Sequence, residues 1–272
     1  MQDAGPDPEI QRMSTPRPST ADKRRQFHAL HASGCFVIPN PWDLGSARML
    51  QGLGFKALAS TSSGFAWSQG HPDNGITRQM ALDHLTELAA GTDLPLNADF
   101  ESGFAPTPAG VAESVRLAVD TGVAGLSIED STGDDARPLF TIDEATDRMR
   151  AARRAIDQAG GDTLLVGRAE CFLVGRPDLD ETIARLQAYA QAGADFLYAP
   201  GIRTPEQIRR VVDALAPKPV NLLVGTPGEL DVAAIAALGV RRISVGGALA
   251  RAAWGGFLRA ARQLADTGRF DG

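Results

Sequence analysis

Eight short apolar runs, separated by amphipathic stretches, constrain the fold of this chain more than any other feature. The runs lie at residues 36–40, 57–61, 96–100, 125–130, 164–170, 196–200, 220–224 and 242–247. Helical spacing of apolar residues is found at 109–121, 143–159 and 178–192, and also at 20–33, where Phe27 and Leu30 mark the inner face. Strands that alternate with helices predict the α/β class, and eight of each favour a closed (β/α)8 TIM barrel over an open doubly wound sheet.

Five glycines support these boundaries, because each stands where a predicted helix ends: Gly54, Gly122, Gly160, Gly193 and Gly239. Glycine at this position accepts the left-handed conformation that caps a helix C-terminus. We expect a single barrel domain over residues 19–272. Residues 1–18, rich in Pro, Asp and Ser, are expected to form a disordered tail.

Composition narrows the classes of partner. The chain has 33 acidic and 27 basic residues, a formal charge of −6, which disfavours nucleic acid and anionic membranes as partners. No apolar stretch is long enough for a membrane span, and the first residues lack the apolar core of a signal peptide. With two cysteines and no CxxC motif, we expect a cytoplasmic protein without a disulfide framework.

Acidic residues end two neighbouring predicted strands. Asp99 and Glu101 are two residues apart, so their side chains share one side of a strand, and Glu129 ends the next. Catalytic residues of barrels lie at these carboxyl ends. Three converging carboxylates repel one another unless a cation neutralises them, and all-oxygen ligands favour Mg²⁺ or Mn²⁺. The alternative is that the acids cap helices or pair with arginines.

The positions of arginine and lysine residues indicate which catalytic mechanisms are possible. Arg168 ends the fifth predicted strand, where its guanidinium could bind a substrate carboxylate or pair with Glu129 or Glu170. Lys56 and Lys218 precede strands, at the wrong end of the barrel for a Schiff-base mechanism. A phosphate-binding barrel of another kind remains an alternative at this point.

Four segments in order resemble the isocitrate lyase/phosphoenolpyruvate mutase superfamily: STSSGFAWSQGHPDNG, PLNADFESGF, GVAGLSIEDS and GRAE. The resemblance covers residues 23–265 and implies a (β/α)8 barrel whose last helix swaps between the subunits of a homodimer or homotetramer. It also implies Mg²⁺, with Asp99, Glu101 and Glu129 in the metal site, the last mostly through water. The substrate would be a small 2-oxo carboxylate that chelates the metal.

The same resemblance implies roles for further residues. Backbone amides near Thr61, Ser62, Ser63 and Gly64 would hold the substrate carboxylate. Arg168 and Asn221 would contact the substrate, and Asp73 would lie near the reacting centre, so the implied catalytic residues are Asp73, Arg168 and Glu129.

Departures from the superfamily pattern narrow the reaction. The loop after Glu129 reads STGDDARPLFT, without the Cys and His of the tricarboxylate lyases, and their strand-six Glu is replaced by Ala199-Pro200. We therefore expect a lyase that cleaves a C–C bond beside a 2-oxo carboxylate, by oxaloacetate-type decarboxylation or substituted-malate cleavage through an enolate. The alternatives are a phosphonopyruvate-type C–P hydrolase or mutase, and a 2-oxo acid-binding protein with little catalysis.

Overall fold

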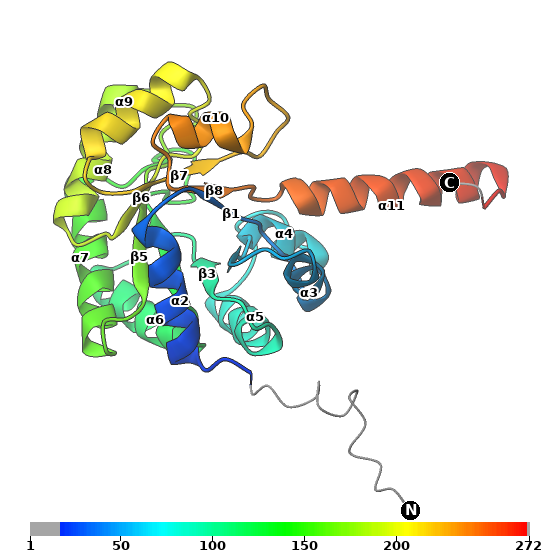
Figure 1. Ribbon diagram of the computed structural model, residues 1–272, viewed down its shortest axis with the longest axis horizontal. Coiled ribbons are helices and arrows are strands. Elements are labelled where there is room, and N and C mark those ends of the chain that lie inside the picture. The colour runs from blue at the N-terminus through cyan, green and yellow to red at the C-terminus, as the bar shows by residue number, and fades with distance from the viewer. Residues whose placement is uncertain (1–16, 271–272) are drawn as a thin grey trace, which may run out of the picture.

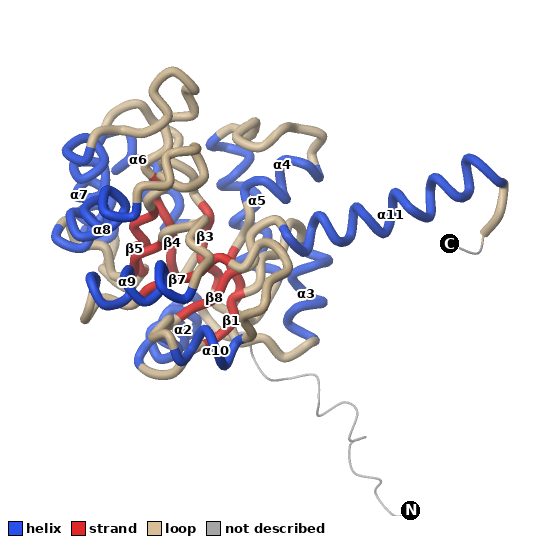
Figure 2. Tube along the Cα trace, turned by 90° about the horizontal axis from the view of Figure 1, so that it is seen from above, coloured by secondary structure: helices blue, strands red, loops and turns tan. Residues whose placement is uncertain are grey.

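The computed structural model describes residues 17–270 and contains an eight-stranded parallel sheet curled into a nearly closed barrel (Figures 1 and 2). The strands are β1 Phe36–Ile38, β2 Leu58–Ala59, β3 Leu96–Asp99, β4 Gly125–Glu129, β5 Leu164–Arg168, β6 Phe196–Tyr198, β7 Val220–Leu223 and β8 Arg242–Ser244. β1 pairs with β8, and the amide of Ala59 donates to the carbonyl of Pro39 across the remaining seam, at 3.0 Å. The predicted (β/α)8 fold is confirmed.

Helices surround the strands in the predicted order (Figure 1). They are α2 Thr20–Ala32, α3 Leu44–Gly52, α4 Ser62–Ser68, α5 Arg78–Gly91, α6 Pro108–Asp120, α7 Ile142–Gln158, α8 Leu179–Gln191, α9 Pro205–Leu215, α10 Val232–Ala237 and α11 Ala248–Thr267. The predicted capping glycines all have positive φ, for example 90° at Gly122 and 102° at Gly193. Helix boundaries therefore follow local chemistry, as expected.

All eight strands are shorter than predicted at their carboxyl ends. The run at 164–170 forms a strand only as far as Arg168, and the run at 242–247 ends at Ser244. The polar and glycine residues that follow leave the sheet and form loops at one edge of the barrel. These loops supply the floor and walls of the candidate site.

The opposite end of the barrel is closed by α2. Phe27 of α2 is fully buried, and an added Cβ at Gly125 of β4 would lie 2.8 Å from its ring. His31 contacts the rings of Phe36 and Phe196, with centroids 5.0 and 4.1 Å away. Burial lowers the pKa of His31 to about 3, so this imidazole is a neutral packing group. Because α2 closes this end, the barrel interior is accessible from the carboxyl ends of the strands.

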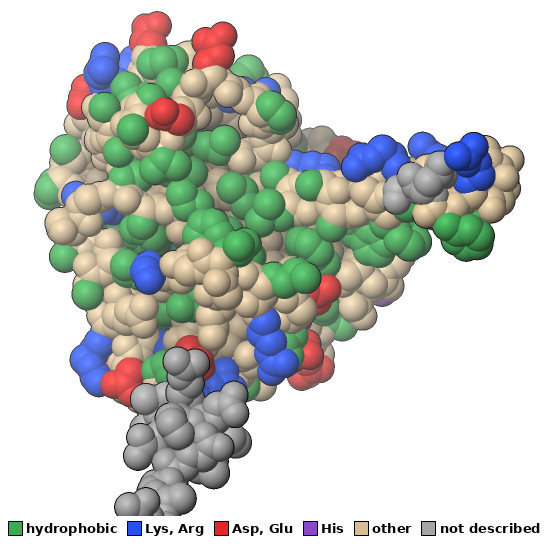
Figure 3. Space-filling view, turned by 45° about the vertical axis from the view of Figure 1, so that its right-hand side comes forward, with side chains coloured by type: hydrophobic (Ala, Val, Ile, Leu, Met, Phe, Trp, Pro, Cys, Tyr) green, Lys and Arg blue, Asp and Glu red, His purple; other side chains and the backbone are tan. Residues whose placement is uncertain are grey.

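The last helix, α11, extends away from the barrel (Figures 1 and 3). Ala250, near its beginning, is its buried residue, whereas Trp254 and Phe257 are 39% and 60% exposed. The predicted helix swap therefore remains a prediction, since one chain is described. No helix within residues 17–270 is both long and apolar enough to cross a membrane.

Most of the predicted N-terminal tail lies outside the described residues. Of residues 1–18, only Arg17 and Pro18 are described, and the guanidinium of Arg17 pairs with Asp93 at 2.7 Å. The single domain over residues 19–272 stays a prediction.

Candidate active site

A cavity of about 420 Å³ lies inside the carboxyl end of the barrel. Its lining includes most of the residues predicted from the sequence: Thr61, Ser62, Ser63, Asp73, Asp99, Glu129, Arg168 and Asn221. Two predicted residues, Glu101 and Gly64, lie next to the cavity but do not line it. Gly64 is needed for packing, because an added Cβ there would lie 2.7 Å from a methyl group of Thr61.

Arg168 is the centre of the site. Its Nη1 lies 3.1 Å from Asp99 Oδ1 and 3.2 Å from Glu129 Oε2, and its Nε donates to Glu170. The guanidinium also lies over the ring of Tyr198, 5.2 Å from its centroid. Neighbouring carboxylates raise the pKa of Arg168 despite the opposing effect of burial. Three acids thus hold the guanidinium rigidly. This matches the predicted pairing of Arg168 with Glu129 or Glu170.

Asp99 is fixed on its other side by the loop after β2. Its Oδ2 accepts hydrogen bonds from the backbone amide and hydroxyl of Ser62, at 3.0 and 2.9 Å, and its own backbone amide donates to the hydroxyl oxygen of Ser60 at 2.8 Å. Thr61 caps α4 by accepting from the amide of Gly64. In this structure the amides of Ser62 and Gly64 are therefore engaged internally, and their predicted contact with a substrate carboxylate remains a prediction.

Glu101 occupies a strained position beside Asp99. Its φ is +46°, a left-handed conformation that non-glycine residues seldom adopt and that is found at functional sites. Its Oε1 is buried and has no hydrogen-bond partner among the described residues. Burial, together with Asp99 and Asp73, raises the pKa of Glu101 to about 8. A buried carboxylate oxygen without a donor is a place where a cation would be stabilised.

The residues fit a hard cation, although they do not form a complete cage. Asp73, Asp99, Glu101, Glu129 and Glu170 outnumber Arg168, and burial raises the pKa of Glu129 and of Glu170 against the influence of Arg168. Yet no three His, Cys, Asp or Glu side chains within residues 17–270 are arranged to hold a metal by themselves. Magnesium keeps several waters, so a site with few direct carboxylate contacts suits it.

Asp73 lies on the loop between α4 and α5, at the rim of the cavity. Asp73 is exposed, and its Oδ1 accepts from the amide of Asn74, which has a φ of 61°. Partial desolvation and the nearby Asp99 raise the pKa of Asp73. A carboxyl group in this position is suited to exchanging protons between bulk water and a ligand in the cavity.

A buried network behind the site was not assigned a role from the sequence. Asp130 accepts hydrogen bonds from the amide of Glu170 at 2.8 Å, the hydroxyl of Tyr189 at 2.6 Å and Arg185 at 3.1 Å. It therefore fixes the backbone that carries Glu170. The sequence offered one signal for this role. Side chains alternate along a strand, so Asp130 must point to the side of β4 opposite to Glu129, away from the cavity.

The turn after β8 is also tied to the barrel by a residue that the sequence did not single out. Asn40 accepts from the amides of Val245 and Gly246, at 2.8 and 2.9 Å, and donates to the carbonyl of Ser60. This one side chain joins the ends of β1, β2 and β8. Asn40 lacked any local signal, because its role depends on segments about 200 residues away.

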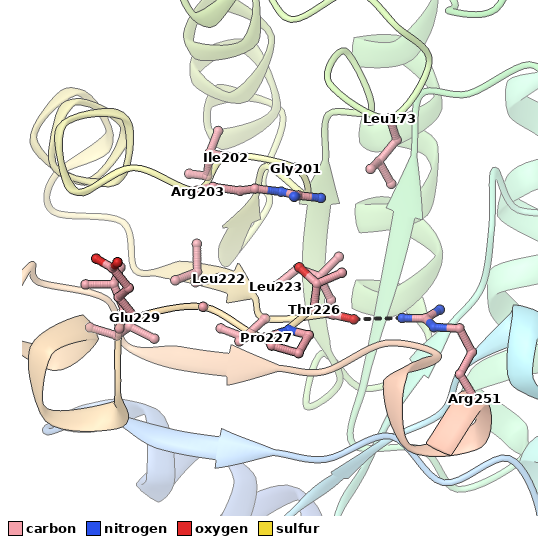
Figure 4. Close-up of a pocket in the computed structure, with 15 residues that line it drawn as sticks. Leu173, Gly201, Ile202, Arg203, Leu222, Leu223, Thr226, Pro227, Glu229 and Arg251 are labelled. Carbon is pink, nitrogen blue, oxygen red and sulfur yellow. Dashed lines mark hydrogen bonds between the residues drawn. The ribbon is translucent and has the colours of Figure 1, made fainter. Parts of the chain in front are cut away.

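A smaller, mainly apolar pocket of about 280 Å³ adjoins the cavity (Figure 4). Leu173, Leu223, Gly225 and Arg251 line both spaces. Arg251 of α11 donates to the carbonyl of Gly225 at 2.7 Å and so anchors the loop after β7. This pocket extends the site beyond the acidic cluster.

Comparison with known proteins shows one consistent family. The profile of the family described as phosphoenolpyruvate phosphomutase matches residues 27–265. A crystal structure from Burkholderia cenocepacia J2315, provisionally described as a lyase/mutase, is 49% identical, covers 92% of this chain and 91% of its own, and has a TM-score of 0.90.

Two curated relatives are similar over most of their length. An uncharacterised protein of Mycobacterium tuberculosis (strain H37Rv) is 32% identical, over 88% of this chain and 89% of its own. The oxaloacetate decarboxylase of Chromohalobacter salexigens is 31% identical, over 82% and 79% respectively.

Proposed function

Because the chain belongs to the phosphoenolpyruvate phosphomutase family, within a superfamily of carbon–carbon lyases and mutases, we propose that it is a lyase. The proposed reaction is Mg²⁺-dependent cleavage of a C–C bond adjacent to a 2-oxo carboxylate. The observation that best supports this proposal is the position of the Arg168 guanidinium, which is held by Asp99, Glu129 and Glu170. The nearby Glu101 has a buried carboxyl oxygen without a hydrogen-bond partner among the described residues. The similarity to an oxaloacetate decarboxylase supports the same reaction class.

The chain's own residues would bind and orient the substrate. Asp99 is the firmest proposed metal ligand, with Glu101 and Glu129 acting through water. When bound, Mg²⁺ supplies Lewis-acid stabilisation of negative charge that develops on the substrate's oxygens. Arg168 would fix the substrate's position by electrostatic attraction, and its rigid pairing means that little reorganisation accompanies the reaction. Asp73 at the rim would relay a proton between solvent and the reacting carbon.

The decisive experiment measures pyruvate formed from oxaloacetate by the purified protein with Mg²⁺ and with EDTA. We expect turnover with Mg²⁺ well above the rate of Mg²⁺ alone, and its loss in EDTA. A rate equal to the metal-only background would exclude decarboxylation. The same assay with 2-methylmalate, which would release pyruvate and acetate on cleavage of its C2–C3 bond, then tests aldol-type cleavage.

A second candidate is C–P bond chemistry on a phosphonopyruvate, which the matched family's name favours. Release of inorganic phosphate from phosphonopyruvate distinguishes hydrolysis of that bond from the proposed lyase. Tight oxalate binding without turnover of any 2-oxo acid would instead indicate a binding protein.

We further propose that α11 packs against a second copy of the chain, giving a homodimer or homotetramer. The exposed apolar side chains of Trp254 and Phe257 support this, because apolar patches of this kind mark association surfaces. Light scattering after size exclusion should give a multimer for the native protein. A shift to monomer is expected for the Trp254→Glu/Phe257→Glu double variant, and a native protein that is monomeric at micromolar concentration contradicts the proposal.

A further inference from the structure

Arg242 is a buried cation without an acidic partner. It opens β8 and is only 3% exposed. Its Nε donates to Asn221 Oδ1 at 2.7 Å, its Nη1 donates to Asn97 Oδ1 at 3.3 Å, and the guanidinium lies 5.4 Å from the Phe196 ring centroid. No carboxylate among residues 17–270 forms an ion pair with it. Burial of an uncompensated charge is costly, so this guanidinium calls for an explanation.

The surrounding amides orient Arg242 instead of neutralising it. Asn221 donates through Nδ2 to Ser244, and Asn97 donates through Nδ2 to the carbonyl of Ala98. Both therefore turn their carbonyl oxygens toward the guanidinium. No oxygen of the described residues accepts a hydrogen bond from Nη2. One end of a preoriented guanidinium thus remains able to bind an anion.

Arg242 lines the same cavity as the acidic cluster. Arg242, Asn97 and Asn221 line the cavity together with Asp99, Glu129 and Arg168. Asn97 precedes Asp99 by two residues on β3, so Arg242 lies one layer of side chains deeper in the barrel. The cavity is consequently acidic toward its mouth and cationic at its base.

We propose that Arg242 binds a second carboxylate of the substrate and thereby makes the site selective for dicarboxylates over monocarboxylates. This inference rests on the proposed function for the position of the first carboxylate, near the metal. Arg168 has three acidic partners already, whereas Arg242 has none. A carboxylate at the base would supply the missing charge and accept a charge-assisted hydrogen bond from Nη2. A methyl group in the same place would leave the cation uncompensated.

The test compares 2-oxo acids that differ only at the far end. Equilibrium binding in the presence of Mg²⁺ is measured by calorimetry for 2-oxoglutarate against 2-oxopentanoate, and for 2-oxoadipate against 2-oxohexanoate, because the proposed decarboxylation does not consume these acids. For at least one pair, the native protein should bind the dicarboxylate tenfold or more tightly, as expected for a hydrogen bond to a charged group. In Arg242→Gln the ratio should fall to about one. Affinity for the monocarboxylate should change much less.

Arg241→Gln is the matched control. The neighbouring Arg241 donates to the carbonyl of Gly34 and does not line the cavity, so its removal changes the net charge equally and should leave the ratio unchanged. Arg242→Met provides a second variant in case the glutamine variant does not fold, and circular dichroism verifies the fold of each.

Two results would overturn the assignment: a native ratio near one for both pairs, or a native ratio retained in a folded Arg242 variant. Repeating the binding in EDTA separates this inference from the proposed function. Affinities that do not depend on Mg²⁺ contradict the metal proposal, while the ratio still reports on Arg242.

Discussion

Arg168→Met is expected to abolish measurable turnover and to destabilise the protein by about 3–5 kcal/mol, the usual effect of removing one partner from a buried ion pair. The substitution leaves Asp99, Glu129 and Glu170 without their common cation, in an environment that is at most 19% exposed. Turnover would fall because the substrate loses its positioning group and the carboxylates repel it. Urea unfolding and the pyruvate assay measure the two effects.

The pH dependence of this variant has a defined sign. Burial already raises the pKa values of Glu129 and Glu170 in the native protein, and Arg168 opposes this effect. Without Arg168 these folded-state pKa values rise further above those of the unfolded chain, so the stability of the variant falls more steeply as pH increases. The loss relative to the native protein should therefore be larger at pH 8 than at pH 6.

Arg116→Met is the control for this experiment. Arg116 also contacts two acids, Glu113 and Asp120, but its side chain is 50% exposed on α6. Exposed ion pairs contribute about 0–1 kcal/mol, so little change is expected. If Arg168→Met and Arg116→Met destabilise the protein equally, burial does not account for the contribution of the Arg168 ion pairs to stability.

Asp99→Asn should lower Mg²⁺-dependent turnover by roughly 10²–10³-fold, because several kcal/mol of metal-derived charge stabilisation would be lost. The amide retains an oxygen that can accept from Ser62, so the fold around α4 should persist. The variant should also lose most of the rise in melting temperature that Mg²⁺ gives the native protein. Both readouts are needed, because a purely structural role for Asp99 would affect stability equally with and without the metal.

Asp120→Asn serves as the matched control, since Asp120 is an exposed acid on α6 that pairs with Arg116. We expect it to retain native turnover and the native response to Mg²⁺. A folded Asp99→Asn protein with the same Mg²⁺ response as this control would contradict Asp99 as a metal ligand.

Local patterns predicted the fold because the barrel repeats one unit whose signals are short-range. Apolar runs define the strands, helical spacing defines the packed faces, and glycines such as Gly122 and Gly193 end the helices with positive φ. The predicted strands extended too far because sequence patterns do not show where hydrogen bonding to a neighbour stops. At Arg168 and Ser244 the loop geometry of the site ends the strand.

The sequence predicted the part of the candidate site that consists of polar residues at the ends of strands. Asp99, Glu129 and Arg168 stood out because a packed core has no need of them there. Asn40 and Asp130 act through partners from distant parts of the chain, so their roles required the assembled barrel. Glu101 was predicted with its two neighbours, but its strained backbone and unpaired oxygen depend on the turn after β3.

The sequence by itself determined the order of strands and helices and the acids at the barrel mouth, because both arise from residue type at fixed spacing. Only the tertiary structure decided which charges are compensated. It placed Arg168 among three acids and left Arg242 with none, although both are arginines on barrel strands. The physical reason is that the energy of a buried charge depends on neighbours brought together from the whole chain, and no local pattern encodes them.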